Sequence, residues 1–512
     1  MTSSWMACAA LAAVLAACSV KRMERTVLPA GRTPGDDTGS GRHLKAHLRD
    51  GGVYVLDNWR MDSGGAVVTG SGRQLDANRV IVRSGTLSVP VASVALFEVD
   101  RATTSGGVTA LAMVSGVTAT IAVVCALNPK ACFGSCPTFY VTDGERPVLQ
   151  AEGFSASIAP ALEATDVDAL YRARPSGRDL EVRMTNEALE THAVRFVHVL
   201  AAPRPAGLRV FATPDDRFVA AGPLTPALSC VAPEGDCTAA LASFDGLERH
   251  SWSDSSDLSA RETVELTFAA APAGPRGLVV ASRQTLMTTY LIYQALAYMG
   301  HSAGEWLASL ERGGPSAVSR ARAMGQLLGN IEVWAQDADG EWVLAGRTGE
   351  TGPIATDVKL VPLPETGPGP VRVRLRMTRG AWRLDWVALG ALGPEVQPVR
   401  LVPVRVVRDG EVDEAALRRL DGSEGPLATL PGDVYTLHFE LPADFADREL
   451  FLEARGYYLE WMRSEWLAEE NLGRAREMVL DPHRALRRLA AAFKRQEAGM
   501  DSVFWGSKYA RN

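Results

Sequence analysis

Residues 371–378 limit the fold of this chain most sharply, because they alternate strictly between apolar and polar side chains. A period of two residues is what a β-strand with one buried face requires. Similar short patterns recur from residue 43 onward, and they are separated by turn residues drawn from 47 Gly and 29 Pro. The sequence therefore predicts a mainly β protein. The polar face of this strand would carry Arg372, Arg374 and Arg376.

The size and charge of the chain narrow the class of protein. With 512 residues it is too long for one core, and at roughly 150 residues per domain it should form two to four domains. Hydrophobic residues make up 46% and charged residues 22%, which is ordinary globular usage. The formal net charge of −7 provides no basic field, so we expect no nucleic-acid partner.

The first residues have the form of an export signal. Met6–Ala17 is an uncharged apolar segment, too short to span a bilayer, and it ends in Leu15-Ala16-Ala17-Cys18. This ending resembles the lipobox of bacterial lipoproteins, which implies that residues 1–18 are a lipoprotein signal peptide and that the Cys18 thiol is acylated, for example with palmitate. Ser19 after the cysteine favours an outer-membrane location. The alternative is an ordinary cleaved signal in which Cys18 is incidental.

Two segments follow the signal. Residues 19–41 are poor in apolar side chains and predict a flexible tether. Residues 42–101 contain five short strand patterns with Gly-rich turns, which predict a small β domain, closed or strongly bent. Its pattern resembles the small Sm-like barrels of bacterial envelope proteins.

An apolar, membrane-proximal segment is predicted at residues 102–131. Residues 107–127 carry no charge and reach the ~20-residue length of a transmembrane helix, although Gly, Ser, Thr and Ala dilute their hydrophobicity. A single span behind a lipid anchor would return the rest of the chain to the cytoplasm. We therefore expect a buried or membrane-dipping hairpin that turns near Ser115 and Gly116. A true transmembrane segment at 107–127, with the first segment a signal remnant, is the alternative.

The cysteine spacing predicts two local disulfides. Cys132 and Cys136 are separated by three residues, which is not the C-x-x-C spacing of redox and zinc sites, and Cys230 and Cys237 flank a short loop. In an exported protein, both pairs are expected to be oxidised. The alternative for the first pair is a metal site completed by distant histidines. We expect neither a metal nor a cofactor.

The stretch around Cys136 carries a family resemblance. Cys132-x-x-x-Cys136-Pro137-x-x-Tyr140, followed by Asp143-Gly144-Glu145 and by residues 151–154, resembles a group of uncharacterised bacterial envelope proteins and lipoproteins. The resemblance implies an envelope location and a strand-rich body. It implies no particular activity.

The remainder of the chain divides into two predicted regions. Residues 132–395 are expected to form a β-sandwich-rich body with one buried helix near 284–311, where apolar residues follow helical spacing. Residues 396–512 mix strand and helix patterns and predict an α+β C-terminal region. Within these regions we expect a strand at Asp179–Thr185 and a short helix at Glu414–Leu420.

Two tryptophans and two histidines are candidate functional residues. Trp382 and Trp386 follow a strand, and the set resembles a galactose-binding-like β-sandwich, in which surface Trp side chains stack on sugars; the alternative is core packing. His192 and His198 are spaced to share a face of one strand, where metal binding or catalysis competes with a structural role.

The common catalytic signatures do not occur in the sequence, including Gly-x-Ser-x-Gly, His-Glu-x-x-His and the phosphate-binding loop. We therefore predict no catalytic residues and no enzyme. The expected function is that of a cell-envelope lipoprotein that binds or scaffolds a partner, which is an envelope protein or a glycan. The alternatives are a carbohydrate-binding envelope protein and an envelope hydrolase.

Overall fold

A computed structural model describes most of the chain, which divides into two compact units. Residues 1–132 with 462–470 form one unit, and residues 133–461 with 471–512 form the other. The segment 107–127, Cys18 and Cys132 lie outside the described residues. The residues described are 20–29, 43–48, 53–75, 81–105, 136–143, 147–188, 190–270, 274–303, 306, 328–349, 352–367, 369–460, 466 and 468–505.

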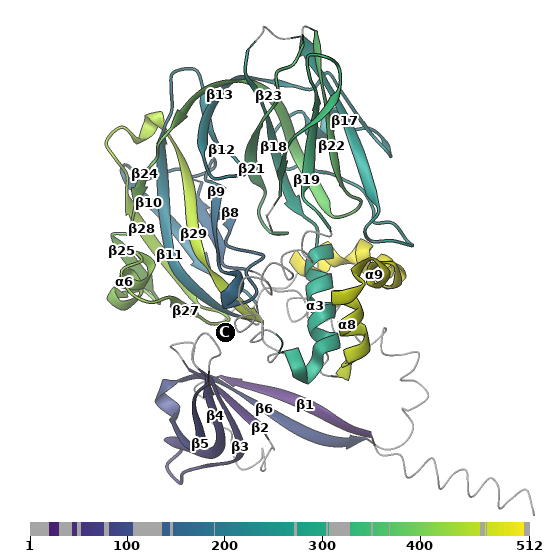
Figure 1. The fold of residues 1–512 in the computed structure, drawn as a ribbon. Helices are drawn as coiled ribbons and strands as arrows, with labels where there is room; N and C mark the ends of the chain where they lie inside the picture. The colour runs from purple at the N-terminus through teal and green to yellow at the C-terminus, as the bar shows by residue number, and fades with distance from the viewer. Residues whose placement is uncertain are drawn as a thin grey trace, which may run out of the picture. The chain divides into compact units, whose positions relative to one another are not determined.

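The first unit contains one six-stranded antiparallel sheet, sheet A (Figure 1). The sheet surrounds a core that includes Leu44, Leu56 and Phe97. In sheet order, its strands are β1 (Val20–Pro29), β6 (Val94–Ser105), β2 (His43–Leu48), β3 (Val53–Met61), β4 (Val67–Leu75) and β5 (Ile81–Pro90).

Strand β1 corrects the predicted tether at 19–41. Residues 20–29 pair with β6, from Val20 opposite Ser105 to Pro29 opposite Leu96. Strand β1 occupies the edge of β6 opposite to β2, where it satisfies backbone groups that would otherwise form an open sheet edge. Backbone hydrogen bonding, to which composition is a poor guide, therefore determines this strand.

The second unit begins as a β-sandwich of two sheets, sheet B and sheet C. Their facing sides share a core that includes Phe139, Val182, Val199, Leu437 and Leu452. Sheet B consists of β26 (Glu411–Val412), β25 (Arg405–Arg408), β28 (Val434–Glu440), β10 (Asp179–Thr185), β7 (Thr138–Thr142) and β8 (Pro147–Glu152). Sheet C consists of β24 (Val399–Leu401), β11 (Glu190–Pro203), β29 (Arg448–Glu460) and β9 (Ala164–Ala169), with β27 (Leu427–Thr429) paired to β11.

The chain leaves the sandwich after β11 and returns to it at β24, and the residues between these strands include a closed barrel, barrel D. The pairing of β13 with β23 closes the ring, and β16 (Arg249–His250) adds to β23. Phe211, Val279 and Leu360 pack together on one face of its strands, whereas Val210 and Ala220 face sheet C. In ring order, its strands are β13 (Phe218–Pro226), β12 (Arg209–Ala212), β21 (Asp357–Pro362), β18 (Arg276–Gln284) and β23 (Trp382–Val396).

Sheet E lies beside β18 and β23 of the barrel (Figure 1). Its strand β22 (Pro370–Thr378) confirms the period-two pattern, because Val373 and Leu375 are buried while Arg372 is exposed. The other strands are β15 (Gly235–Asp236), β14 (Ser229–Ala232), β17 (Arg261–Ala270), β19 (Ile331–Gln336) and β20 (Trp342–Thr348).

Barrel D and sheet E are an insertion in the sandwich. They are built from residues 204–396, whereas β11 before them and β24 after them are neighbours in sheet C, with Ala201 opposite Val399. Residues 396–512 contain both strands and helices, as predicted. Their strands complete sheets B and C, so this α+β part is continuous with the sandwich. Long-range pairings such as that of β10 with β28 carry no signal in local sequence.

Helices complete this unit (Figure 1). Helix α3 (Met287–Met299) confirms the helix predicted near 284–311, and it ends at Gly300, which has φ 50°. Helices α8 (Leu472–Leu480) and α9 (Pro482–Trp505) pack beside it, with the rings of Tyr290 and Phe493 5.1 Å apart. Helix α6 (Glu414–Leu420) lies separately, against β11 and β25. Among the described helices, none has the length and apolar character needed to cross a bilayer.

Candidate functional site

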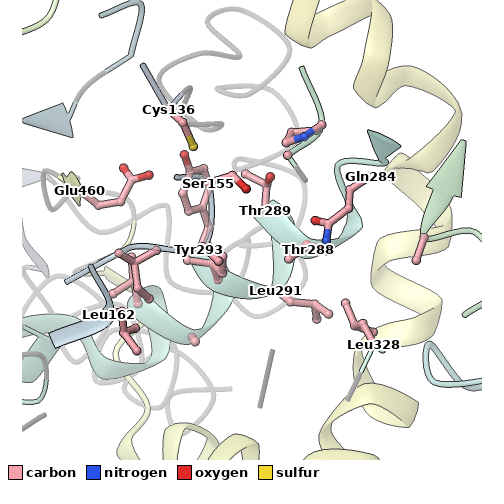
Figure 2. A pocket seen from close by; sticks show the side chains of 18 of the residues that line it. Cys136, Ser155, Leu162, Gln284, Thr288, Thr289, Leu291, Tyr293, Leu328 and Glu460 are labelled. Atoms are coloured by element: carbon pink, nitrogen blue, oxygen red, sulfur yellow. The ribbon is translucent and has the colours of Figure 1, made fainter. Parts of the chain in front are cut away.

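A cavity of about 520 Å³ lies within the second unit, where sandwich, barrel and helices meet. The sandwich contributes the ends of β8, β11 and β29, the barrel contributes the end of β18 and the start of β23, and α3 lines a third side. Figure 2 shows several of the lining side chains, including Cys136, Tyr293, Gln284 and Leu291. The volume is in the range of sites for small organic ligands.

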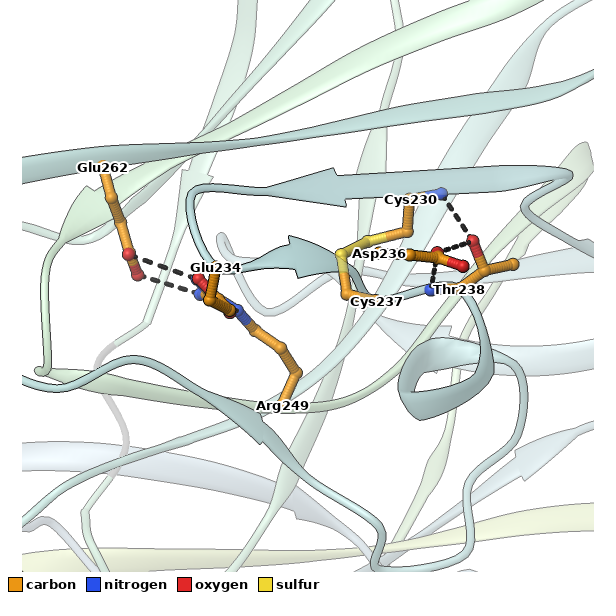
Figure 3. Close-up of a disulfide and its surroundings, with 7 residues drawn as sticks. All are labelled: Cys230, Glu234, Asp236, Cys237, Thr238, Arg249 and Glu262. Carbon is orange, nitrogen blue, oxygen red and sulfur yellow. Dashed lines mark hydrogen bonds and ion pairs between the residues drawn. A yellow bond between two sulfur atoms is a disulfide. The ribbon is translucent and has the colours of Figure 1, made fainter.

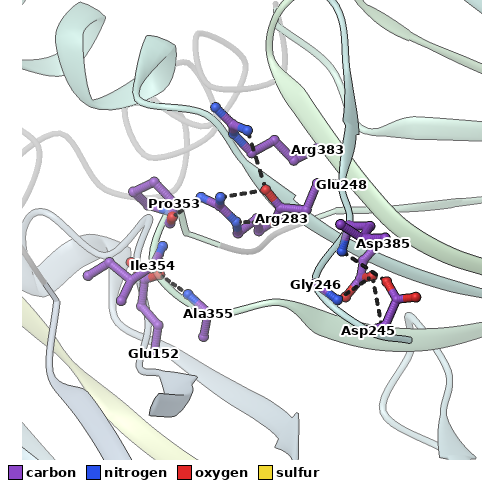
Figure 4. Close-up of polar contacts among 11 residues, drawn as sticks. Glu152, Asp245, Gly246, Glu248, Arg283, Pro353, Ile354, Ala355, Arg383 and Asp385 are labelled. Atoms are coloured by element: carbon purple, nitrogen blue, oxygen red, sulfur yellow. Dashed lines mark hydrogen bonds and ion pairs between the residues drawn. The ribbon is translucent and has the colours of Figure 1, made fainter. Parts of the chain in front are cut away.

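Glu152, the last residue of β8, places a carboxyl group on the cavity wall. Its side chain is buried, and Oε2 accepts hydrogen bonds from the backbone N–H groups of Ile354 at 2.7 Å and Ala355 at 3.3 Å (Figure 4). Oε1 is buried and accepts no hydrogen bond from the described part of the chain. The group is thus half satisfied, with one oxygen left for a further donor.

Burial controls the protonation of this group and of the neighbouring thiol. Removal from water raises the pKa of Glu152 to about 7. The hydrogen bonds from the two backbone N–H groups lower this pKa, but they offset only part of the increase. Burial, followed by the nearby Glu152 and Glu190, raises the pKa of the Cys136 thiol well above its usual value. At neutral pH, Cys136 is therefore a protonated thiol and a poor nucleophile.

Two further carboxyl groups line the cavity. Glu190 begins β11 and Glu460 ends β29, and the antiparallel pairing places these two residues opposite each other. Glu190 is fully buried, and its Oε1 lies 2.7 Å from Nε2 of His192. Together with Glu152, they give the described lining three carboxyl groups and no Lys, Arg or His side chain.

A cation near the cavity is already engaged elsewhere. Arg283, adjacent to the lining residue Gln284, pairs with Glu248 at 2.5 and 2.6 Å and donates to the Pro353 carbonyl at 2.7 Å (Figure 4). It lowers the pKa of Glu152 only as the last of several contributions. The guanidinium group of Arg283 is thus occupied by Glu248 and by the Pro353 carbonyl.

The rest of the lining is largely apolar and aromatic. Leu291, Leu296 and Met299 of α3 line the cavity together with Leu162 and Trp306. Three aromatic rings with polar edges also contribute: Tyr293, Tyr458 and Trp382. The cavity therefore combines three carboxyl groups with a mainly apolar and aromatic lining that can contact a hydrocarbon chain.

The structure separates the two candidate tryptophans. Trp382 is 1% exposed and lines the cavity, whereas Trp386 packs with Phe211 and Phe244 in barrel D. The cause is a β-bulge, since Ala281 and Ser282 of β18 pair with Trp386 and Leu384 and leave one residue over. The two rings therefore pack in the interior, as the core-packing interpretation predicts, and they do not form a pair of surface rings for sugar stacking.

The cysteines give one confirmation and one correction. Cys230 and Cys237 form the predicted disulfide, with a Cα–Cα distance of 5.0 Å (Figure 3). Cys136 carries a free, buried thiol, so the predicted bridge to Cys132 is not formed. The Cys136 side chain lies beside the Glu152 carboxyl group rather than in a surface loop.

A buried ion-pair cluster lies close to the disulfide in Figure 3. Arg249, on β16, bonds Glu234 at 2.6 and 2.9 Å and Glu262 at 2.8 and 3.2 Å. The side chains of Arg249 and Glu262 are almost fully buried, so each depends on the other for its compensating charge. This cluster joins the barrel strand β16 to β17 of sheet E.

The candidate histidines each contact a carboxylate. His192 lies against Glu190, and Nδ1 of His198 lies 3.3 Å from Glu453. A register shift between Val194 and Phe196 separates the two histidines along β11, so their shared strand does not align them as predicted. Over the described ranges, no group of His, Cys, Asp and Glu side chains has the arrangement of a metal site.

Sequence reasoning missed the acidic residues of the cavity. Glu152, Glu190 and Glu460 come from three distant strand ends and have no characteristic spacing. Only Glu152 fell within a noted motif, at residues 151–154. The closing of the chain onto itself through β11 and β29 brings these groups together.

Comparison with known proteins provides no family. No protein-family model and no curated protein matches the sequence. Solved structures with some similarity include a GH31 alpha-xylosidase from Xanthomonas citri, at 7% identity and a TM-score of 0.15 over 86% of this chain and 38% of that chain. An exo-beta-1,3-galactanase from Phanerochaete chrysosporium has 8% identity and a TM-score of 0.14, over 66% of this chain and 82% of that chain. The VP2 subviral particle of infectious bursal disease virus has 10% identity and a TM-score of 0.14, over 95% of this chain and 94% of that chain. These scores are too low to establish a shared fold, and no functional conclusion rests on them.

Proposed function

We propose that this chain is a cell-envelope lipoprotein, anchored at Cys18 in the outer membrane, whose body binds a small amphiphilic molecule. The lipobox-like Leu15-Ala16-Ala17-Cys18 supports the anchor. The Cys230–Cys237 disulfide supports an oxidising compartment such as the periplasm or the cell surface. Binding, with no chemical step, is the proposed activity.

The cavity of about 520 Å³ is the observation that carries this proposal. Its walls are mainly apolar, and a few polar groups are concentrated at the strand ends, as in small-molecule sites generally. Catalysis is not favoured, because the thiol that lines the cavity is held in its protonated form. Stacking of sugars is not favoured either, because Trp382 is buried and Trp386 packs partly buried against the core of barrel D.

Filling the cavity tests the proposal. The mature chain from residue 18, with Cys18→Ser so that no lipid is attached, is titrated with the neutral dye Nile red. Ala295→Trp places a large side chain in the lining of α3, whereas Ala491→Trp makes the same change at an exposed position of α9. We expect saturable fluorescence enhancement for the parent and for Ala491→Trp, and at least a tenfold weaker response for Ala295→Trp. Equal responses of the two variants would exclude the cavity as the binding site.

A further inference from the structure

The distribution of charge in the cavity says more about its ligand. We infer that the cavity selects amphiphiles with a cationic head group, an ammonium or quaternary ammonium ion, over neutral and anionic amphiphiles of the same chain length. This inference rests on the proposed function and specifies the ligand class of the same cavity.

The first argument is the charge of the described lining. Glu152, Glu190 and Glu460 contribute carboxyl groups, and none of the described lining residues is a Lys, Arg or His. The nearby Arg283 is paired with Glu248. A cavity with walls of one sign and low dielectric concentrates ions of the opposite sign and repels ions of the same sign. Because Glu190 already contacts His192, the buried Glu152 carboxyl group carries most of this effect, and a fatty acid would bring its own carboxylate against it.

The second argument is the state of Glu152. This side chain is 3% exposed, lines the cavity, and leaves Oε1 without a hydrogen bond from the described residues. The Cys136 thiol lies beside the carboxyl group, but a thiol is a weak donor. A buried carboxylate without a compensating charge is costly, and a bound cation would remove that cost.

The third argument is the presence of aromatic rings in the same lining. Tyr293, Tyr458 and Trp382 all contribute to the cavity wall. The negative faces of such rings attract quaternary ammonium ions, in particular where water is excluded. Aromatic rings and carboxylates together form a wall suited to an organic cation and not specific for a metal ion.

The fourth argument is the distance between the acidic side chains and part of the apolar lining. Figure 2 shows Cys136 and Glu460 well apart from Leu291 and Leu328. A head group near the carboxyl groups would thus leave a hydrocarbon chain to run along α3, past residues such as Leu296. Each methylene group removed from water there contributes about 0.8 kcal/mol.

Three amphiphiles with the same twelve-carbon chain test the inference. Dodecyltrimethylammonium, dodecanol and dodecanoate are titrated, each below its critical micelle concentration, against the mature chain carrying Nile red at pH 8. We expect dodecyltrimethylammonium to displace the dye at a concentration at least about tenfold lower than dodecanol, and dodecanoate to be the weakest competitor. Glu152→Gln should reduce the preference for the cation to below about threefold while dodecanol still competes. Glu265→Gln, on sheet E, should change neither value.

The outcomes separate the two proposals. If dodecanol competes as well as the cation does, the cavity binds amphiphiles without selecting charge, so this inference is overturned while the proposed function stands. If none of the three displaces the dye, the proposed function falls as well. Because Glu152→Gln affects a buried group, Glu460→Gln at a half-buried position provides a second test. An unchanged preference in both variants would contradict the role of the carboxyl groups.

Discussion

Gly352 lies against the carboxyl group of Glu152 so closely that a Cβ at residue 352 would overlap with Oε1, Cδ and Oε2. The absence of a side chain at this position is what allows the carboxyl group to reach the N–H groups of Ile354 and Ala355. A residue from the sandwich and a loop of the inserted region thus share one space. The cavity depends on that fit.

Gly352→Ala tests the fit directly. The added methyl group must displace the Glu152 carboxyl group, so we expect dye affinity to fall and the free energy of unfolding to decrease by about 1–3 kcal/mol. Urea unfolding followed by circular dichroism measures the second effect. Gly425→Ala is the matched control, since a Cβ there meets no atom within 4 Å, and it should be neutral or slightly stabilising. Equal stability of the two variants would show that Glu152 can move at little cost.

The protonation of Glu152 predicts how stability changes with pH. The folded chain holds the pKa of this group at about 7, above the ordinary value of 4.5, so the folded state binds the proton more tightly than the unfolded state does. The protonated Glu152 side chain therefore stabilises the folded state fully below about pH 4.5. This stabilisation is lost as the pH rises to about 7, which lowers the free energy of unfolding by about 3 kcal/mol.

Glu152→Gln removes this dependence. The difference in free energy of unfolding between the parent and the variant should change by about 3 kcal/mol between pH 4.5 and pH 7 in ligand-free protein, with the parent losing stability as the pH rises. Glu265→Gln, an exposed position, should follow the parent. Parallel curves for the parent and Glu152→Gln would mean that the carboxyl group is solvated.

Alkylation of thiols distinguishes the free Cys136 from the predicted bridge. Native protein treated with iodoacetamide without reductant should react slowly at Cys136, because the thiol is buried and protonated, and rapidly once denaturant is added. Cys230 and Cys237 should react only after reduction. Peptide mass spectrometry reads out each site. A Cys136 that needs reductant under denaturing conditions would show that it is disulfide-bonded.

The Arg249 cluster predicts a large effect on stability. Arg249→Met leaves the carboxylate of Glu262 buried without its cation, which should cost about 3–5 kcal/mol of unfolding free energy. Arg217→Met is the control, because Arg217 pairs with Asp215 at an exposed surface, where the loss should stay below about 1 kcal/mol. Thermal unfolding of both variants provides the comparison. Similar shifts in the two would contradict the burial of the cluster.

Local patterns in the sequence predicted individual elements well. The strand Asp179–Thr185 and the helix Glu414–Leu420 have the bounds expected from period two and from helix-forming residues. The helix begins after Asp413, whose side chain accepts the N–H of Ala416. Such features depend on neighbours within a few residues, so the sequence displays them.

Features that depend on distant pairing escaped prediction. The bulge in β23 that separates Trp382 from Trp386 arises from the register with β18, about a hundred residues earlier in the chain. The meeting of Glu190 with Glu460 arises in the same way, from the pairing of β11 with β29. Composition also failed at residues 20–29, which form a strand through backbone bonds to β6.

The position of the insertion has a consequence for how the chain must be made. The strand β11 is completed early in synthesis, but its partners β24, β27 and β29 emerge only after residues 204–398 have passed. In a chain exported from its N-terminus, the apolar surface of β10 and β11 would wait for these partners while the inserted barrel folds, which is an interval in which a holding chaperone has a role. Ala201 and Val399 are direct neighbours in sheet C, so the points where the chain leaves and rejoins the sandwich lie within one strand spacing of each other. A chain joined there, with the insert deleted, would have its sandwich strands in immediate succession.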